Sequence, residues 1–357
     1  MIIGIPREHV DDEKRVGLST VAVHALVEEG HEVLVERGAG DASGFSDDAY
    51  REAGAVIAHG TEEVYGRGDL LVKVQYPTRD EYAWLHEGQT LMAYLHLPTR
   101  GPGLMDILRE RACGTVDYAA IERDDGTLPV LASMSRIAGR MVPHIAARYL
   151  QTDHGGNGIL LGGLPAVPPA EAVVLGGGFA GSNAARALLG CGARVSLLDV
   201  DYERLRELHW QFEGGVTTYV SSPYTLAKVL SFADVVVGAV RVPEGRAPVV
   251  VDAALVENLR EGSVVIDLSI DQGGCFETSR PTRPSDPTYV WHGVTHFCVP
   301  NVPSMAARTA THALSNAVLP FVSRIAADGL EAAAADDPAL RRGTNLIAGR
   351  GGSGGAA

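Results

Sequence analysis

Three glycines at positions 176, 178 and 181 have the spacing Gly-x-Gly-x-x-Gly. They follow the apolar run 172–175 and precede an amphipathic run over 180–189, so the sequence predicts a strand, a tight turn and a helix. In such a unit the first glycine allows the turn, the second lets the backbone approach a pyrophosphate, and the third lets helix and strand pack closely. The N-terminal N–H groups of the helix then face the phosphates. We therefore predict a dinucleotide-binding turn, in preference to a connection that is merely glycine-rich.

Asp199 ends the next apolar run, near the spacing at which an acidic residue binds the ribose hydroxyls of a dinucleotide. A carboxylate at this position repels a 2′-phosphate. The predicted cofactor is therefore NAD and not NADP. Neither the turn nor the acidic residue indicates which reaction the cofactor serves.

Strand-like and helix-like runs alternate through most of the chain, which is typical of an α/β fold with mostly parallel sheets. Strands are expected at 2–5, 31–35, 70–74, 90–95, 114–118, 172–175, 194–199, 235–237 and 263–267. Helices are expected at 19–29, 80–86, 104–111, 133–151, 180–189, 202–212, 225–232, 252–259 and 304–327. The run 349–357 is rich in glycine and is expected to be a flexible tail.

Length and composition limit the possible functions. At 357 residues the chain exceeds the usual size of a single core, so we expect two domains with a cleft between them. The formal charge of −14, with no basic cluster, argues against a nucleic-acid partner. No long apolar run predicts a membrane span or a secretory leader, so we expect a cytoplasmic protein. Four widely spaced cysteines suggest neither a disulfide framework nor a zinc site, and no metal is predicted.

Several further motifs together resemble one family, the alanine dehydrogenases and the related soluble subunit of proton-translocating transhydrogenases. The resemblance covers about nine-tenths of the chain, and its most specific run is Asp271-Gln272-Gly273-Gly274-Cys275-Phe276-Glu277. Other matching runs are 4–8, 15–16, 30–35, 38–40, 43–47, 94–97, 134–135, 138–140, 175–181, 183–186, 197–199, 238–240, 279–282 and 298–299.

The resemblance implies a fold of two Rossmann-like, doubly wound domains that enclose a cleft. We expect a discontinuous substrate domain at 1–128 plus 307–357 and an NAD-binding domain at 129–306. It also implies reversible oxidative deamination of L-alanine to pyruvate and ammonia, in a homo-oligomer that is a hexamer or a dimer.

Individual roles follow from the positions that match. Arg15 resembles the arginine that holds the substrate carboxylate, His96 the general acid/base, and Asp271 the acidic residue beside the nicotinamide. Taken alone, Arg15 would fit a surface residue and His96 a hydrogen-bonded core histidine. Residues that match the family's dinucleotide-lining positions are Ser135, Asp199, Arg204, Ser221, Val240, Leu268, Val299 and Asn301, in addition to Gly176, Gly178 and Gly181.

The chain departs from the family's pattern at positions that bear on the substrate. The second lysine of the family's Lys-Val-Lys-Glu-Pro, which contacts the substrate, is Gln75 here. The carboxylate of a Tyr-Glu pair is lost at Ala119, and another carboxylate becomes Arg136. Arg241 stands where the family usually has a leucine.

These exchanges favour a substrate other than alanine, namely another amino acid, a 2-oxo acid or an imine. Gln75 and Arg136 are then predicted substrate-binding residues, and Arg136 or Arg241 would pair with a second acidic group. Sequence drift after a loss of selection on the enzymatic role, with no new substrate, is a weaker explanation of these exchanges. The glycine turn, His96 and Asp271 are all retained. Redox-neutral use of bound NAD, and NAD sensing without catalysis, remain as alternatives; a membrane proton pump is disfavoured.

Overall fold

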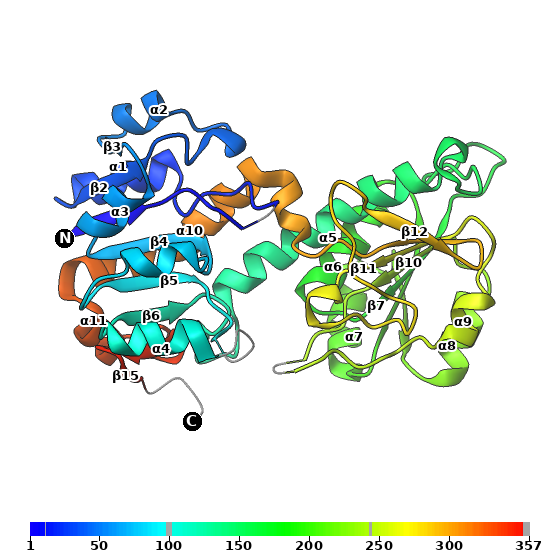
Figure 1. Cartoon of the computed structure of the whole chain (residues 1–357). Helices are drawn as coiled ribbons and strands as arrows, with labels where there is room; N and C mark the ends of the chain where they lie inside the picture. Colours follow the sequence, from blue (N-terminus) through cyan, green and yellow to red (C-terminus); the bar gives the residue numbers. More distant parts are fainter. Residues whose placement is uncertain (11, 98–101, 243–244, 353–357) are drawn as a thin grey trace. The chain divides into compact units, whose positions relative to one another are not determined.

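The computed structural model describes residues 1–10, 12–97, 102–242 and 245–352. The chain divides into two compact units (Figure 1). Unit 1 comprises Met1–Met134 together with Ser304–Ala357, and unit 2 comprises Ser135–Pro303. Each unit is an α/β structure built on one sheet, so the expected fold class is confirmed.

The sheet of unit 1 has, among the described residues, the strand order β15-β14-β6-β5-β4-β1-β2-β3. Its parallel part consists of β1 (Ile2–Ile5), β2 (Glu32–Glu36), β3 (Val56–Ala58), β4 (Leu70–Gln75), β5 (Thr90–Tyr94) and β6 (Gly114–Asp117). At the other edge, β14 (Thr344–Ile347) pairs antiparallel with β6, and β15 (Arg350–Gly351) pairs antiparallel with β14. The last part of the chain therefore completes the sheet that the first part begins.

Helices of unit 1 come from both ends of the chain. They are α1 (Thr20–Glu28), α2 (Asp47–Glu52), α3 (Thr61–Arg67), α4 (Pro102–Glu110), α10 (Ala307–Asp328), α11 (Leu330–Asp336) and α12 (Pro338–Gly343). The helix α5 (Pro129–Tyr149) begins in unit 1 and continues in unit 2.

The sheet of unit 2 has the order β12-β13-β11-β10-β7-β8-β9. Its strands are β7 (Glu171–Leu175), β8 (Arg194–Asp199), β9 (Thr217–Val220), β10 (Val235–Gly238), β11 (Val264–Asp267), β12 (Thr288–Trp291) and β13 (Val294–Phe297). All pairs are parallel except β12 with β13. The accompanying helices are α6 (Phe179–Gly190), α7 (Tyr202–Gln211), α8 (Pro223–Leu230) and α9 (Ala253–Glu257).

Both faces of the unit 2 sheet are covered. Along β10, Val235 and Val237 pack into one buried cluster, whereas Val236 packs into a second. Successive side chains of a strand point to opposite faces, so the two clusters lie on opposite sides of the sheet. This arrangement explains why the strands are continuous apolar runs rather than alternating ones.

Two expected elements are corrected. Residues Asp80–Trp84 form a short 3₁₀ helix instead of an α-helix over 80–86. The expected tail at 349–357 begins too early, because Arg350–Gly351 pair with Leu346 and Ile347 in the β14–β15 ladder. Its remainder, 353–357, lies outside the described residues.

Candidate active site

The glycine turn of unit 2 links β7 to α6. Gly176 has φ +98°, and a Cβ there would lie 2.5 Å from the carbonyl oxygen of Ala239. A Cβ at Gly181 would collide with the carbonyl oxygen of Gly176, so this glycine lets α6 pack against the turn. At Gly178, which caps α6, an added Cβ would meet no atom within 4 Å. Open space beside this backbone is what a pyrophosphate needs in order to approach it.

Asp199 and Arg204 both form hydrogen bonds with the backbone of Gly177. An oxygen of the Asp199 carboxylate accepts the backbone N–H of Gly177 at 2.5 Å, and its other oxygen accepts that of Asp201 at 3.0 Å. The Nε of Arg204 donates to the carbonyl oxygen of Gly177 at 2.8 Å. The acidic residue is thus held beside the turn, which is the position that a ribose-binding carboxylate takes in dinucleotide-binding folds. These residues fit NAD.

The other predicted cofactor residues follow the carboxyl ends of the parallel strands. These ends meet at one edge of a sheet, which is where ligands bind in open α/β sheets. The N–H of Ser221 donates to the Asp199 carbonyl, that of Val240 to the Ser269 hydroxyl, and that of Leu268 to the Gly238 carbonyl. After β13 come Val299, which is buried, and Asn301, whose φ is +56°. Ser135 lies apart from this edge in sequence, half-buried on α5.

Asp271 lies in a short 3₁₀ helix, Ile270–Gln272, that follows β11. One of its carboxylate oxygens accepts the backbone N–H of Asn301 at 3.1 Å. The structure therefore brings Asp271 to the same strand-end edge of unit 2 as the cofactor residues.

Arg136, predicted to bind substrate, lies in unit 2 as well. It is exposed on α5, and its guanidinium carbon is 5.1 Å from the centroid of the Phe179 ring. Phe179 is the first residue of α6. Arg136 is thus a neighbour of the glycine turn. Arg241 lies in the loop after β10, two positions beyond Ala239, and is also exposed.

Arg15 of unit 1 makes a two-pronged ion pair with Glu13. Its Nε lies 2.8 Å from Oε1 of Glu13, and its Nη2 lies 2.6 Å from Oε2. The side chains are 2% and 1% exposed, and the Nη1 atom lies 3.2 Å from the sulfur of Met134. Burial opposes the charge of both groups, yet the pairing outweighs it: the pKa of Glu13 is lowered and that of Arg15 is raised.

Gln75, at the end of β4, points its side chain at the same carboxylate. Its amide nitrogen donates to Oε2 of Glu13 at 3.0 Å. Behind it, the buried Glu8 carboxylate accepts the backbone N–H groups of Val74 at 2.7 Å and Gln75 at 3.2 Å. Glu8 therefore fixes the end of the strand that presents Gln75.

Burial raises the pKa of Glu8 to about 7, although Lys73, whose Nζ is 3.7 Å from Oε2, acts in the opposite direction. Lys73 lies nearer to a second carboxylate, that of Glu81, at 2.7 Å. The side chain of this lysine is 1% exposed, and it forms ion pairs with buried carboxylates inside unit 1.

His96 follows β5 with φ +47°, a conformation that non-glycine residues rarely adopt. Its backbone N–H donates to a carboxylate oxygen of Asp117 at 2.8 Å, which holds this bend in place. The imidazole stacks on Tyr94, with 6.1 Å between ring centroids. Tyr118 packs edge-on against Tyr94, and its hydroxyl is buried with no hydrogen-bond partner in the described part of the chain.

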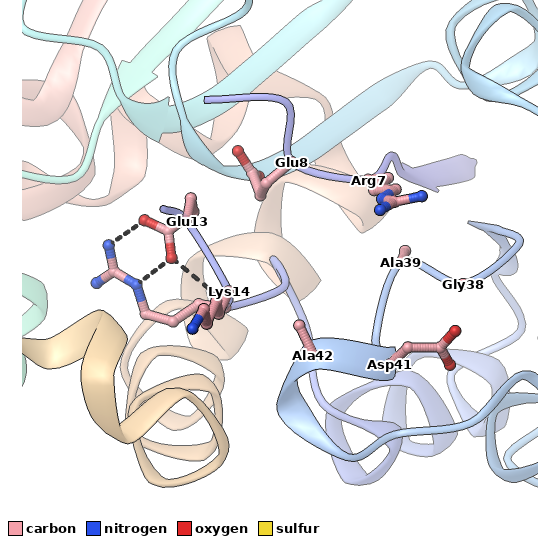
Figure 2. A pocket seen from close by; sticks show the side chains of 9 residues that line it. Arg7, Glu8, Glu13, Lys14, Gly38, Ala39, Asp41 and Ala42 are labelled. Carbon is pink, nitrogen blue, oxygen red and sulfur yellow. Dashed lines mark hydrogen bonds and ion pairs between the residues drawn. The ribbon is translucent and has the colours of Figure 1, made fainter. Parts of the chain in front are cut away.

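A pocket of about 200 Å³ adjoins Glu13 in unit 1 (Figure 2). It is lined by Arg7, Glu8, Lys14 and Asp41 as well as by the Glu13–Arg15 pair. Arg7 and Lys14 are exposed, and neither side chain forms an ion pair with any residue that the structure describes.

Sequence reasoning missed three of these residues: Glu13, Glu8 and Asp117. Each carboxylate supports a predicted site residue rather than standing in a motif of its own. No local pattern marks Glu13, because its pairing with Arg15 depends on side-chain directions in a loop. The residues described include no group of three or more His, Cys, Asp or Glu side chains that could hold a metal. Within the same residues, no helix has both the length and the apolar character needed to cross a membrane.

Comparisons with known proteins agree over nearly the whole chain. The family described as "Alanine dehydrogenase/PNT, N-terminal domain" matches residues 4–138, and its "C-terminal domain" matches residues 143–351. An alanine dehydrogenase of Mycolicibacterium smegmatis is 41% identical over 98% of this chain and 94% of its own length. One from Staphylococcus saprophyticus is 44% identical over the same shares.

Solved structures give the same result. An L-alanine dehydrogenase structure is similar with a TM-score of 0.94 and 42% identity, covering 98% of this chain and 96% of that one. A transhydrogenase from Sinorhizobium meliloti has a TM-score of 0.84 at 23% identity, over 98% of each chain, and shares the fold. The two-domain Rossmann-like architecture is thereby confirmed.

Proposed function

The chain belongs to the alanine dehydrogenase/PNT family, and from this premise we propose that it deaminates an L-amino acid other than alanine. The protein is an NAD-dependent oxidoreductase that acts on CH–NH₂ groups. In the proposed reaction an amino acid, NAD⁺ and water give a 2-oxo acid, ammonium, NADH and a proton. The reverse direction reduces the corresponding imine.

One observation carries the proposal that the substrate is not alanine. The fork of Arg15 faces the carboxylate of Glu13, and the neighbouring position 75 holds a neutral amide. The charges of Glu13, Arg15 and Gln75 therefore sum to zero where the resemblance expects a surplus cation for the substrate carboxylate. A small substrate that offers little besides its carboxylate, as alanine does, gains less from this site than a substrate with further polar groups.

The two units have different tasks in this proposal. Unit 2 binds NAD at the edge formed by Gly176, Gly178, Gly181 and Asp199, with Ser135, Arg204, Ser221, Val240, Leu268, Val299 and Asn301 around it. Unit 1 supplies the substrate side through Arg15 and Gln75. Arg136, beside Phe179, is an additional substrate-binding candidate.

The chain's own residues bind and orient the substrate and move its protons. Bound NAD supplies the hydride acceptor. Arg15 orients the substrate carboxylate through paired N–H donors. His96, kept at its bend by Asp117, exchanges a proton with the amino or carbonyl group at the α-carbon. Asp271, anchored by the N–H of Asn301, assists the attacking water or the departing ammonia.

A substrate screen tests the proposal. Amino acids with NAD⁺, and 2-oxo acids with ammonia and NADH, are compared by kcat/KM from the absorbance of NADH. We expect at least one amino acid to exceed alanine by about tenfold or more. Turnover of alanine with the highest kcat/KM of the set would contradict the substrate proposal. Consumption of a substrate without any change in NADH would contradict net dehydrogenation.

We also propose that the protein self-associates, as a hexamer or a dimer, and works in the cytoplasm. The described surface of unit 2 exposes Leu160, Leu164 and Val167, and the chain's four cysteines are unpaired. Exposed apolar groups favour association, and free thiols suit a reducing compartment. Light scattering of the purified protein would measure the assembly directly.

A further inference from the structure

Glu13 occupies the donors with which an arginine usually receives a carboxylate. Two parallel N–H···O contacts, 2.8 Å and 2.6 Å long, join its carboxylate to Nε and Nη2 of Arg15. A substrate carboxylate that seeks the same fork presents the same two oxygens in the same plane. The two carboxylates therefore compete for one binding position.

Position 75 does little to retain Glu13 against such a competitor. A lysine there would hold the carboxylate by charge after it left Arg15. The amide of Gln75 offers one neutral hydrogen bond of 3.0 Å instead.

A second place for the carboxylate lies next to it. The pocket of about 200 Å³ is bounded by Glu13 and carries the cations Arg7 and Lys14 on its wall (Figure 2). Neither cation is ion-paired within the described residues. Two acids also line the pocket: Asp41, and Glu8, whose pKa is raised to about 7 so that it is only partly ionised near neutrality. The cations thus have capacity for one more carboxylate.

We propose that Glu13 is a displaceable specificity residue: it fills the fork of Arg15 in the empty enzyme and turns toward Arg7 and Lys14 when a substrate carboxylate arrives. This inference rests on the proposed role of Arg15. Binding then replaces one buried carboxylate with another, so the carboxylate alone adds little affinity. The enzyme then distinguishes between substrates by their groups other than the carboxylate. In this proposal the neutral residue at position 75 goes together with a change of substrate for that reason.

The test measures the binding of pyruvate, as a plain carboxylate probe, by calorimetry and by thermal shift without turnover. Glu13→Gln removes the carboxylate that faces Nε and Nη2 of Arg15, so we expect the Kd of pyruvate to fall about tenfold. In Lys14→Gln the displaced Glu13 loses a counter-ion, so we expect the Kd to rise by about threefold. Lys228→Gln, which removes an exposed lysine of α8, is the matched control and should leave the Kd unchanged.

The double variant Glu13→Gln/Lys14→Gln decides the mechanism. If Lys14 acts only by receiving Glu13, the double variant binds pyruvate as Glu13→Gln does, and the effect of Lys14→Gln disappears. An equal effect of Lys14→Gln in both backgrounds would show that Lys14 contacts the ligand itself and would overturn the proposal. Weaker binding in Glu13→Gln would also overturn it, because Glu13 would then be needed to orient Arg15.

Two provisions keep these outcomes separate from other failures. If Glu13→Gln does not fold, Glu13→Asp, which is too short to span the fork, should shift the Kd in the same direction. If the substrate screen finds no dehydrogenase activity while the binding pattern is as expected, the proposed function fails and the displacement of Glu13 stands.

Discussion

In the proposed substrate site, the neutral side chain of Gln75 is the feature that bears most directly on substrate choice. It lies within hydrogen-bond distance of Glu13, which in turn holds Arg15. A lysine at position 75 would attract Glu13 and leave the Arg15 fork to the substrate.

We therefore expect Gln75→Lys to lower the KM for alanine about tenfold, or ~1.4 kcal/mol, with a smaller change in kcat. Steady-state kinetics with NAD⁺ would measure this. Gln151→Lys, which adds the same charge at an exposed position after α5, should leave the KM unchanged. An unchanged KM in Gln75→Lys would separate position 75 from substrate binding.

Glu8 makes stability depend on pH in an unusual direction. Its pKa is raised from 4.5 to about 7, chiefly because burial disfavours the charged form. Between these values the folded protein keeps a proton that the unfolded chain has released. The contribution of the protonated Glu8 carboxyl to the free energy of unfolding is fully present below the pKa that Glu8 has in the unfolded chain. It is lost as the pH rises through the pKa of Glu8 in the folded protein.

We accordingly expect the free energy of unfolding to fall by about 2–3 kcal/mol from this group between about pH 5 and pH 8. The variant Glu8→Gln has no such proton and should flatten the fall, as measured by urea titrations at several pH values. The carboxyls of Glu13 and Glu81, whose pKa values are lowered, lose their contribution only at lower pH. An equal slope in the variant and the wild-type protein would exclude Glu8 as its origin.

Among individual residues, the sequence could predict those that belong to a recognisable motif. It could not predict the residues whose side chains hydrogen-bond to the site residues and keep them in position. Gly176, Gly178 and Asp199 come with a spacing that has a physical meaning, so they could be recognised. The pairing of Arg15 with Glu13 depends on side-chain directions in a loop, which no periodicity encodes. The same holds for Asp117, whose carboxylate supports His96 from the neighbouring strand.

At the scale of elements, the connection from β7 to α6 contains two glycines with opposite surroundings. A Cβ at Gly178 enters open space, whereas a Cβ at Gly181 meets the backbone of Gly176. Gly178 therefore leaves space for a ligand beside the backbone, and Gly181 lets α6 pack against the turn.

This contrast predicts different outcomes for two alanine variants. Gly178→Ala should cost no more than about 1 kcal/mol of stability but weaken NAD binding about tenfold or more. Gly181→Ala should destabilise the protein by about 1–3 kcal/mol or more, because α6 must move away from the turn. Thermal unfolding and calorimetric titration with NAD would measure both. Equal loss of stability in the two variants would contradict the assignment of separate roles.

The inner strands of each sheet could be predicted from the sequence, whereas the outer strands could not. The strands β1, β2, β4, β5, β6, β7, β8, β10 and β11, and the helices α5, α6 and α7, coincide with expected runs to within a few residues. The strands β3, β9, β12, β13, β14 and β15 were not expected. They occupy the outer positions of the two sheets and are two to four residues long, so they lack the continuous apolar run of a strand that is buried on both faces. The stretch Asp80–Trp84 is helical in type but too short and too tight for the predicted α-helix.

At the scale of the whole molecule, the C-terminal segment belongs to the sheet of unit 1. Leu346 of β14 is 1% exposed, and its N–H donates to the hydroxyl of Thr115 in β6 at 3.0 Å. Removing this strand would uncover the edge of β6 and open a gap in the core.

Deletion of residues 344–357 should therefore destabilise unit 1 by about 3 kcal/mol or more, while unit 2 keeps its NAD binding. Deletion of 353–357 alone is the control and should have no effect. Limited proteolysis and calorimetry would distinguish the units. If both deletions behave alike, the β14 strand contributes nothing to the stability of unit 1.

The return of residues 304–357 to the first unit also has a consequence during synthesis of the protein. Unit 2 is one continuous segment of the chain. All of it therefore leaves the ribosome before β14, the strand that pairs with β6, has been synthesised. For that interval the nascent chain presents an open, apolar sheet edge, of the kind that attracts other chains. The order of translation thus makes the first-made part of this protein the last to be completed.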